Sequence, residues 1–458
     1  MTGVQTCALP ISARLDTLVA HFLGARNEAK TRLYAALAAE HATRTLAFER
    51  AAELYDLLTR LAPDAQSRRQ YQVALGDALV NCGRGHEAAT AYLDALAASS
   101  GRDVIDLERQ AAAELIRAGY MEEATGVLQR LLPKVGITPP RSDAQSIATF
   151  LGYRAALAVR GLKIQPRPEA EVSRELLDRL DVLIAIAPPY TLISLARGLS
   201  LNVRLVWSAL QAREPKRAAV ALAVFASSVT MNGTKSMNAA LEIVRLAREL
   251  AIPVGDRWTL ARTDIAEGIS LKVSGFWRQG IATLERAIDT FMHCPGSRWE
   301  IETSQTLRHD AMIWTGDWHR IGLEIPARRN DAHQRGDRYS ESQILARLTP
   351  VIRLRDDRLA DAIAEAESAR EFWDRPNFNL QHRAAVCGLL DIDLYGGQFQ
   401  QAFFQYSQQD VVGFGPRAVE LVVDQRQAEL AGRGDAIVHP DLGHVLLGLH
   451  HGVDEVIH

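Results

Sequence analysis

The sequence predicts an all-α protein, a solenoid of antiparallel helix hairpins that winds as a right-handed superhelix. Apolar residues recur at steps of three and four over most of the chain, which is typical of helices that bury one face. A short turn motif returns at intervals of 36 to 41 residues, which is typical of helical repeats. Alternating β-branched runs and Asn-Gly turns, the usual signs of strands, are nearly absent.

The helical periodicity is clearest in residues 41–61, 88–98, 171–186 and 237–250. Two serines have the spacing of a capping box before a helix, Ser142 with Gln145 and Ser297 with Glu300. Proline pairs indicate breaks between helices at 139–140, 166–168 and 188–189.

The repeat consists of a turn residue, usually glycine, with a small or apolar residue five positions later. Glycine adopts φ > 0 at little cost, so it suits a tight turn between two helices. A small residue one turn into the second helix lets the two backbones approach. The copies are Gly83 with Ala88, Gly119 with Ala124, Gly275 with Gly280, Gly316 with Ile321, Asp357 with Ala362 and Gly397 with Ala402, and a weaker copy is Glu214 with Ala219.

A large apolar residue stands two positions after the turn residue in the later copies, including Trp277 and Trp318. These tryptophans could stack on a ligand, but their repeat position favours packing over the open end of a hairpin. A single hairpin cannot bury its apolar face, so neighbouring hairpins must stack and share a core.

Composition and charge argue against several classes of protein. The formal net charge of -3 gives no basic surface for nucleic acid or for an anionic membrane. The longest apolar stretch, residues 218–229, is too short to cross a bilayer. Four cysteines (Cys7, Cys82, Cys294 and Cys387) lie far apart, as expected of reduced thiols in the cytoplasm.

Motifs of catalysis are absent from the sequence. It contains no G-x-x-x-x-G-K-[ST] phosphate loop, no kinase H-R-D motif and no H-E-x-x-H zinc motif. We therefore expect no catalytic residue, no cofactor and no metal site. Five histidines fall between His439 and His458, but their irregular spacing favours a loose tail over a metal site.

The first three repeats resemble tetratricopeptide repeats, whose pattern runs L-G-x₂-Y…A-x₃-F…P. The match is closest in the second repeat, over Leu75, Gly76, Leu79, Gly83, Ala88, Tyr92 and Ala95. A wider resemblance runs through residues 112–140, 151–167 and 391–402. These stretches are similar to the C-terminal helical region of bacterial proteins that join a serine/threonine kinase domain to an AAA-type signalling ATPase.

The resemblance implies a non-catalytic interaction or sensor region, with the kinase and ATPase domains upstream. Two alternatives stay open. One is the inducer-sensing helical arm of an ATPase-linked transcription regulator, and the other is a free-standing tetratricopeptide adaptor.

The repeat register implies a partner-binding surface on the first helices of the hairpins. Its inward positions are Asp77 and Asn81 in one copy and Arg109 and Arg117 in the next. Arginine and asparagine side chains in a row suit an extended acidic peptide or a carboxylate. Ordinary surface polarity is the competing interpretation.

The expected organisation has four parts. Residues 1–12 resemble translated sequencing-adapter read-through and are expected to be a non-native or disordered leader. Residues 13–135 hold the tetratricopeptide-like repeats, residues 136–435 hold longer hairpins, and residues 436–458 form the loose tail.

Overall fold

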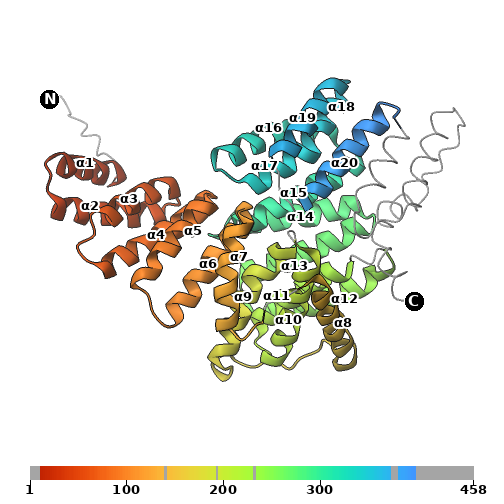
Figure 1. Cartoon of the computed structure of the whole chain (residues 1–458), viewed down its shortest axis with the longest axis horizontal. Helices are drawn as coiled ribbons and strands as arrows, with labels where there is room; N and C mark the ends of the chain where they lie inside the picture. The colour runs from red at the N-terminus through yellow and green to blue at the C-terminus, as the bar shows by residue number, and fades with distance from the viewer. Residues whose placement is uncertain (1–10, 139–141, 192–193, 231–233, 373–379, 399–458) are drawn as a thin grey trace, which may run out of the picture. The chain divides into compact units, whose positions relative to one another are not determined.

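The computed structural model describes residues 11–138, 142–191, 194–230, 234–372 and 380–398. These residues form an all-α fold: helices follow one another along the chain, and no β-strand occurs in these ranges (Figure 1). The chain divides into two compact units. Unit 1 comprises Met1–Lys134 with Arg335–Asp337, and unit 2 comprises the rest.

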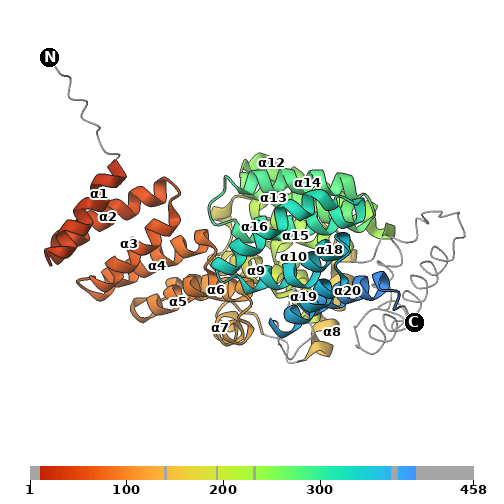
Figure 2. The ribbon, with the colours of Figure 1, turned by 90° about the horizontal axis from the view of Figure 1, so that it is seen from above.

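Unit 1 is a row of helices in which each helix packs against the next, as Figures 1 and 2 show. Tight turns join most successive helices of the unit, so hairpins recur along it. The right-handed superhelical course stays a prediction. The helices are α1 (Ile11–Gly24), α2 (Glu28–Arg44), α3 (Phe48–Arg60), α4 (Ala65–Cys82), α5 (Gly85–Ala95), α6 (Arg102–Ala118) and α7 (Met121–Lys134).

The same backbone turn recurs between successive helices in both units. At Gly83, for example, the Arg84 amide donates to the Leu79 carbonyl (2.9 Å) and the Gly83 amide donates to the Val80 carbonyl (3.0 Å). This pair of bonds is the Schellman motif, which requires a residue with positive φ. The turn residues are Arg26, Leu46, Gly83, Gly119, Gly275, Gly316, Asp357 and Gly397.

The residue five positions after each turn faces the interior. The amide of Ala88, for example, makes the first hydrogen bond of α5, so the turn leads into the next helix without a linker. Ala88 and Ala124 are fully buried, and Gly280 lies where its added Cβ would approach the Gly268 carbonyl. The buried set is Thr31, Ala51, Ala88, Ala124, Gly280, Ile321 and Ala362, while Ala402 lies outside the described residues.

The weaker sequence copy, Glu214 with Ala219, was assigned one residue too late. Arg213 is the residue with positive φ (56°), and Glu214 instead caps α11 (Pro215–Val229) by accepting from the amides of Lys216 and Arg217. Arg26 and Leu46 also occupy turn positions that the glycine pattern did not show.

Unit 2 follows the same principle with longer helices and some packing between next-but-one neighbours. The principal core lies among α8 (Asp143–Arg160), α10 (Leu195–Ala212), α11, α12 (Met237–Val254) and α13 (Arg257–Val273), and it includes Val206, Leu222 and Ala226. Its helices after α11 are α12 (Met237–Val254), α13 (Arg257–Val273), α14 (Trp277–Phe291), α15 (Arg298–Thr315), α16 (Trp318–Gln334), α17 (Arg338–Gln343), a π-helical turn η5 (Ile344–Leu348), α18 (Thr349–Arg355), α19 (Leu359–Phe372) and α20 (Leu380–Tyr395). Before α11 come α8 (Asp143–Arg160), α9 (Arg174–Thr191) and α10 (Leu195–Ala212).

The two repeat tryptophans are half-buried at helix starts. The Trp277 ring stacks on Trp314, with centroids 5.6 Å apart. Trp318 packs against a cluster that includes Met312 and Ile325. Both side chains therefore contact protein.

Two local predictions from the sequence were wrong. Pro188 and Pro189 lie in the last turns of α9 and not between helices. The Ser297 hydroxyl makes no capping bond, because its residue has φ -96° and ψ 18° and its oxygen is buried without a hydrogen-bond partner. At Ser142 the expected cap is present, since its hydroxyl accepts from the Gln145 amide at 3.2 Å.

The chain ends fall largely outside the described residues. Within the expected leader, Ile11 and Ser12 already belong to α1, and the expected tail from residue 436 is not described. Cys82, Cys294 and Cys387 form no disulfide. Within the described ranges, no helix has both the length and the hydropathy that spanning a membrane requires.

Candidate partner-binding site

The candidate site in unit 1 is built around Tyr92, a fully buried residue of α5. Gly76 of α4 leaves the space for its ring, since a Cβ at residue 76 would lie 2.5 Å from the Tyr92 Cε1 atom. The glycine and the tyrosine of the tetratricopeptide-like pattern therefore pack directly against each other. This contact sets the spacing of α4 and α5.

Asp77 of α4 holds the hydroxyl end of Tyr92. The Tyr92 hydroxyl donates to the Asp77 Oδ1 atom at 2.7 Å. Burial, together with the negative charge of Asp77, raises the pKa of Tyr92 well above its ordinary value. Tyr92 therefore stays neutral and remains a hydrogen-bond donor.

Charged residues of the next hairpin lie near the same hydroxyl. The charge of Glu114 on α6 adds to the upward shift of the Tyr92 pKa, and the charge of Arg109 opposes it. Arg117 donates to the Glu114 Oε1 atom at 2.6 Å. Arg109 is held less closely, because its ion pair with Asp106 spans 3.6 Å.

Of the four predicted residues, Asp77 thus contacts the Tyr92 hydroxyl, and Arg109 lies close enough for its charge to act on that group. Asn81 lies one turn along α4 from Asp77, and its side-chain amide donates to the Asp77 carbonyl at 2.8 Å. Arg117 lies two turns along α6 from Arg109. The side chains of Arg109 and Arg117 are about one-quarter exposed, so part of each guanidinium-bearing side chain is open to a ligand.

Sequence reasoning missed Glu114 and the hydrogen bond that the Tyr92 hydroxyl donates to Asp77. The repeat pattern included Tyr92 only as a matching position, although a tyrosine at a buried repeat position does signal that its hydroxyl needs a partner. Glu114 stands three residues before Arg117, a spacing that places both side chains on one helix face. That spacing was the available signal.

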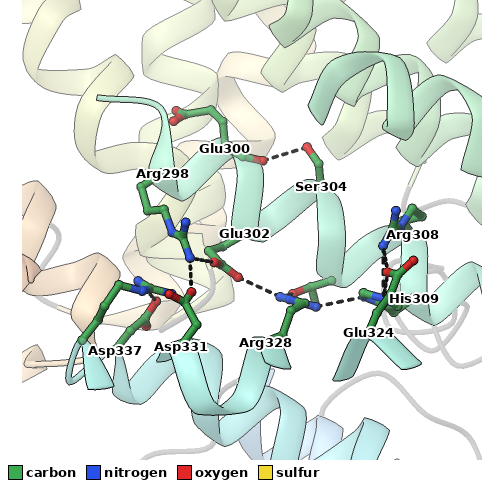
Figure 3. Close-up of polar contacts among 12 residues, drawn as sticks. Arg298, Glu300, Glu302, Ser304, Arg308, His309, Glu324, Arg328, Asp331 and Asp337 are labelled. Atoms are coloured by element: carbon green, nitrogen blue, oxygen red, sulfur yellow. Dashed lines mark hydrogen bonds and ion pairs between the residues drawn. The ribbon is translucent and has the colours of Figure 1, made fainter. Parts of the chain in front are cut away.

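A second polar cluster, which no sequence motif indicated, lies between α15 and α16 of unit 2 (Figure 3). Figure 3 shows a line of ion pairs and hydrogen bonds that runs along the two helices. Glu302 accepts from Arg298 (2.7 Å) and Arg328 (2.8 Å), and all three side chains are buried or partly buried. We call the residues of this line the α15–α16 network: Arg298, Glu302, Arg308, His309, Glu324 and Arg328.

His309 is the fully buried centre of the network. Arg328 Nη1 lies 2.9 Å from Nδ1 of the ring, and Glu324 Oε2 lies 2.7 Å from Nε2. Because arginine only donates hydrogen bonds, Nδ1 accepts from Arg328. Nε2 faces both Arg308 Nη2, at 3.2 Å, and the Glu324 carboxylate, and the shorter contact with Glu324 favours a proton on Nε2 that is donated to Glu324. The neighbours of His309 therefore select one neutral tautomer of its ring.

Burial and charge move the pKa values of this pair. Burial lowers the pKa of His309 below 6.5, and the charges of Arg328 and Arg308 add to that shift. Burial also acts to raise the pKa of Glu324. The hydrogen bond from His309 and the charge of Arg308 outweigh it and lower that pKa to about 2. The network is built for a neutral histidine and an ionised glutamate.

We expect the free energy of unfolding to fall in two steps as the pH is lowered. The folded pKa of His309 lies below 6.5, so the unfolded chain takes up this proton first and stability is lost as the pH falls through 6.5. The folded pKa of Glu324, about 2 against 4.5, gives a second loss as the pH falls from 4.5 toward 2. Urea midpoints measured over this pH range test the expectation.

The variant His309→Gln separates the two steps, because glutamine does not titrate. Its urea midpoint should lose the dependence near pH 6.5 that is due to His309. It should keep a loss below 4.5, because the charge of Arg308 still lowers the pKa of Glu324. If the urea midpoint changes with pH near 6.5 as steeply in this variant as in the wild type, the assignment of that step to His309 is wrong.

Among the described residues, no group of three or more His, Cys, Asp or Glu side chains is arranged to hold a metal ion. The fold and the site define an all-α protein of tandem helix hairpins with polar side chains on successive first helices. No protein-family model matches the chain, and no similar sequence is found among curated proteins.

Proposed function

We propose that this chain is a non-catalytic, tetratricopeptide-like interaction region that binds an acidic protein segment on unit 1. The observation that carries the proposal is the grouping of Asp77, Tyr92 and Arg109 from three helices of two successive hairpins. We further propose that it serves as a sensor or scaffold arm of a cytoplasmic bacterial signalling protein with kinase and AAA-type ATPase domains. That part rests on the sequence resemblance.

The chemistry of the grouping favours a carboxylate ligand. Arg109 presents a guanidinium group whose nearest acidic partner, Asp106, is at 3.6 Å, longer than a charge-assisted hydrogen bond. Arg117 is bound to Glu114 at 2.6 Å, so a ligand carboxylate must compete with Glu114 for it. We therefore expect Arg109 to contribute more to binding than Arg117. Asn81 adds a neutral polar group one turn from Asp77.

Replacing both arginines with alanine tests the site. The probe is a fluorescein-labelled hexaglutamate peptide, and its anisotropy is measured as the protein is titrated. The double variant Arg109→Ala/Arg117→Ala should weaken binding by about 1–3 kcal/mol for each lost bond. Raising the salt concentration should weaken wild-type binding too, because exposed charges are screened over about 8–10 Å at physiological ionic strength.

A matched control removes the same charge from second helices of unit 1. Arg60 on α3 and Arg130 on α7 are more than half exposed, and Arg60→Ala/Arg130→Ala should bind the peptide nearly as wild type does. If both double variants lose affinity equally, the binding is non-specific attraction to positive charge. If only the control loses affinity, the interface lies on the second helices. Either result overturns the site.

The proposal includes the absence of ATP hydrolysis by this region. The sequence holds no phosphate-binding glycine loop, which ATPases need to cradle the nucleotide phosphates. Purified protein should release no phosphate from ATP above a blank. Turnover above that blank, present in independent preparations and abolished by heating the protein, would contradict a non-catalytic role.

A further inference from the structure

Helix α8 (Asp143–Arg160) is unusual in unit 2 because it buries so little of its apolar surface. Only Ser146 and Leu157 are buried, and the helix packs on one side, mainly against α10. In Figures 1 and 2 it lies at the edge of unit 2. Its opposite side is exposed and apolar over the whole length of the helix. This α8 apolar face consists of Ala144, Ile147, Ala148, Leu151, Gly152, Ala155, Ala158 and Val159.

The face is more apolar than an exposed helix surface needs to be. Val159 is 91% exposed, Ile147 50% and Leu151 44%, and no charged residue interrupts the stripe. The residues recur at steps of three and four, so they lie along one side of the helix. Contiguous exposed apolar patches mark interaction sites in soluble proteins. The stripe is therefore suited to another helix.

The centre of the stripe is open. Gly152 has no heavy atom within 4 Å of the position that its Cβ would occupy, other than its own helix and chain neighbours. Glycine at the middle of an 18-residue helix costs helix stability, but it lets a second backbone come close. Leu151 and Gly152 are the two central residues of α8.

We propose that the α8 apolar face binds the same face of a second copy of this chain, with the two α8 helices antiparallel. In such a pair a two-fold axis passes by the helix centres, so residues equally far from the two ends meet in one layer. The pairing is self-complementary in size. Leu151 meets the partner's Gly152, Val159 meets the partner's Ala144, and Ala148 meets the partner's Ala155.

In these layers Leu151 and Val159 each meet a small side chain, and in the same register Ile147 meets the partner's Ala156, beside the face. Alternation of large and small residues across facing positions is what allows two helix surfaces to interdigitate. Antiparallel helices also place the positive end of one helix dipole beside the negative end of the other. A parallel pair would place Leu151 beside Leu151 and Gly152 beside Gly152, so its layers would be alternately crowded and empty.

The size of the face predicts a weak dimer. An 18-residue helix is about 27 Å long, and a helix is about 10 Å wide. The contact strip is thus well below the roughly 800 Å² per partner of a standard stable interface. We expect monomers at about 1 μM and a measurable dimer fraction at about 100 μM, as befits a transient interface.

Sedimentation velocity over this concentration range is the first experiment, with the full chain. Wild type should show a concentration-dependent monomer–dimer equilibrium. Leu151→Glu buries a charge in the pairing and should raise the dimer Kd at least about tenfold. The matched control is Ile252→Glu, since Ile252 is an exposed residue of α12 (61%) outside the face. It should dimerise as wild type does.

A disulfide trap tests the geometry. Helix axes about 8–10 Å apart, less two Cα radii of about 2.3 Å, leave the Cα atoms that face each other about 3.4–5.4 Å apart, and the upper part of this range overlaps the roughly 4.4–6.8 Å that is usual in disulfides. Leu151→Cys should therefore form a covalent dimer under mild oxidation, faster than Ile252→Cys. Wild type measures the background from the native cysteines.

Several results would overturn the proposal. A wild type that stays monomeric at about 100 μM would show that no second copy binds to the α8 apolar face. Equal loss of dimer in Leu151→Glu and Ile252→Glu would place the interface elsewhere. Equal trapping of Leu151→Cys and Ile252→Cys would show that Leu151 does not lie at the centre of the interface. Circular dichroism of each variant distinguishes these outcomes from a failure to fold.

Discussion

Gly76→Ala should lower the free energy of unfolding of unit 1 by about 1–3 kcal/mol, although alanine is the better helix former. The new methyl carbon would lie 2.5 Å from the Tyr92 Cε1 atom and 2.8 Å from Cζ. Tyr92 is only 2% exposed and cannot move outward without opening the contact between α4 and α5. The added methyl group therefore overpacks the contact with a buried ring, which cannot move away to relieve it.

The displacement should also reach the candidate partner-binding site. Moving the ring draws the Tyr92 hydroxyl away from Asp77. The hydrogen bond of 2.7 Å that joins the two helices is then lengthened or lost. Peptide affinity should therefore fall in Gly76→Ala even under conditions where the variant remains folded. The measurements are urea unfolding followed by circular dichroism, and anisotropy of the labelled peptide at low temperature.

Gly126→Ala is the matched control in the same unit. Gly126 lies inside α7, and no heavy atom stands within 4 Å of its would-be Cβ. The substitution should stabilise by about 0.5–1 kcal/mol, because it removes only the backbone entropy of glycine. If Gly76→Ala were neutral or stabilising like this control, the packing of Tyr92 on Gly76 would be wrong.

The hairpin turns could be predicted from sequence where glycine supplies the positive φ. Gly83, Gly119, Gly275 and Gly316 carry their own conformational signal, and each lies at a turn in the structure. Leu46 and Arg213 carry no such signal. They adopt φ of 60° and 56° because the packing of the helices on either side requires a turn there, and the cost of a left-handed side chain is small beside the burial gained.

The candidate partner-binding site could be predicted only in part. The repeat register selected Asp77 and Arg109 because corresponding positions of successive hairpins face the same way. It could not show that Glu114 neutralises Arg117, or that Asp106 is near Arg109, because each depends on which rotamer the arginine adopts. The register therefore identified the positions but not their pairing.

The α15–α16 network was not predictable from the sequence. A helix with charges at Glu302 and Arg308 has the appearance of a solvated surface. The partners that bury these charges, Glu324 and Arg328, stand on the next helix and make contact only after the hairpin closes. An amphipathic pattern distinguishes polar from apolar faces, and it does not distinguish a solvated polar face from one paired with another polar face.

Glu302→Ala should be the most damaging single substitution in this network, costing about 3–5 kcal/mol of unfolding free energy. The Glu302 side chain is 7% exposed and holds Arg298 at 2.7 Å and Arg328 at 2.8 Å. Its removal leaves the Arg328 guanidinium, itself 10% exposed, without a carboxylate at hydrogen-bond distance on that side. The cost comes mainly from the buried charge that remains, and less from the pair that is lost.

A double substitution separates these two contributions. Glu302→Met/Arg328→Met removes both charges and fills similar volume with apolar atoms, so it should recover a large part of the loss seen in Glu302→Ala. The exposed pair of Arg245 and Glu249 on α12 provides the control, and Glu249→Ala should leave the unfolding midpoint within error of wild type. Thermal and urea unfolding of the four proteins supply the comparison.

A Glu302→Ala midpoint as close to wild type as that of Glu249→Ala would mean that water reaches Arg328, and that the α15–α16 network is a surface feature. Equal destabilisation in the single and double variants would mean instead that the packing of these side chains, and not their charge, holds α15 to α16.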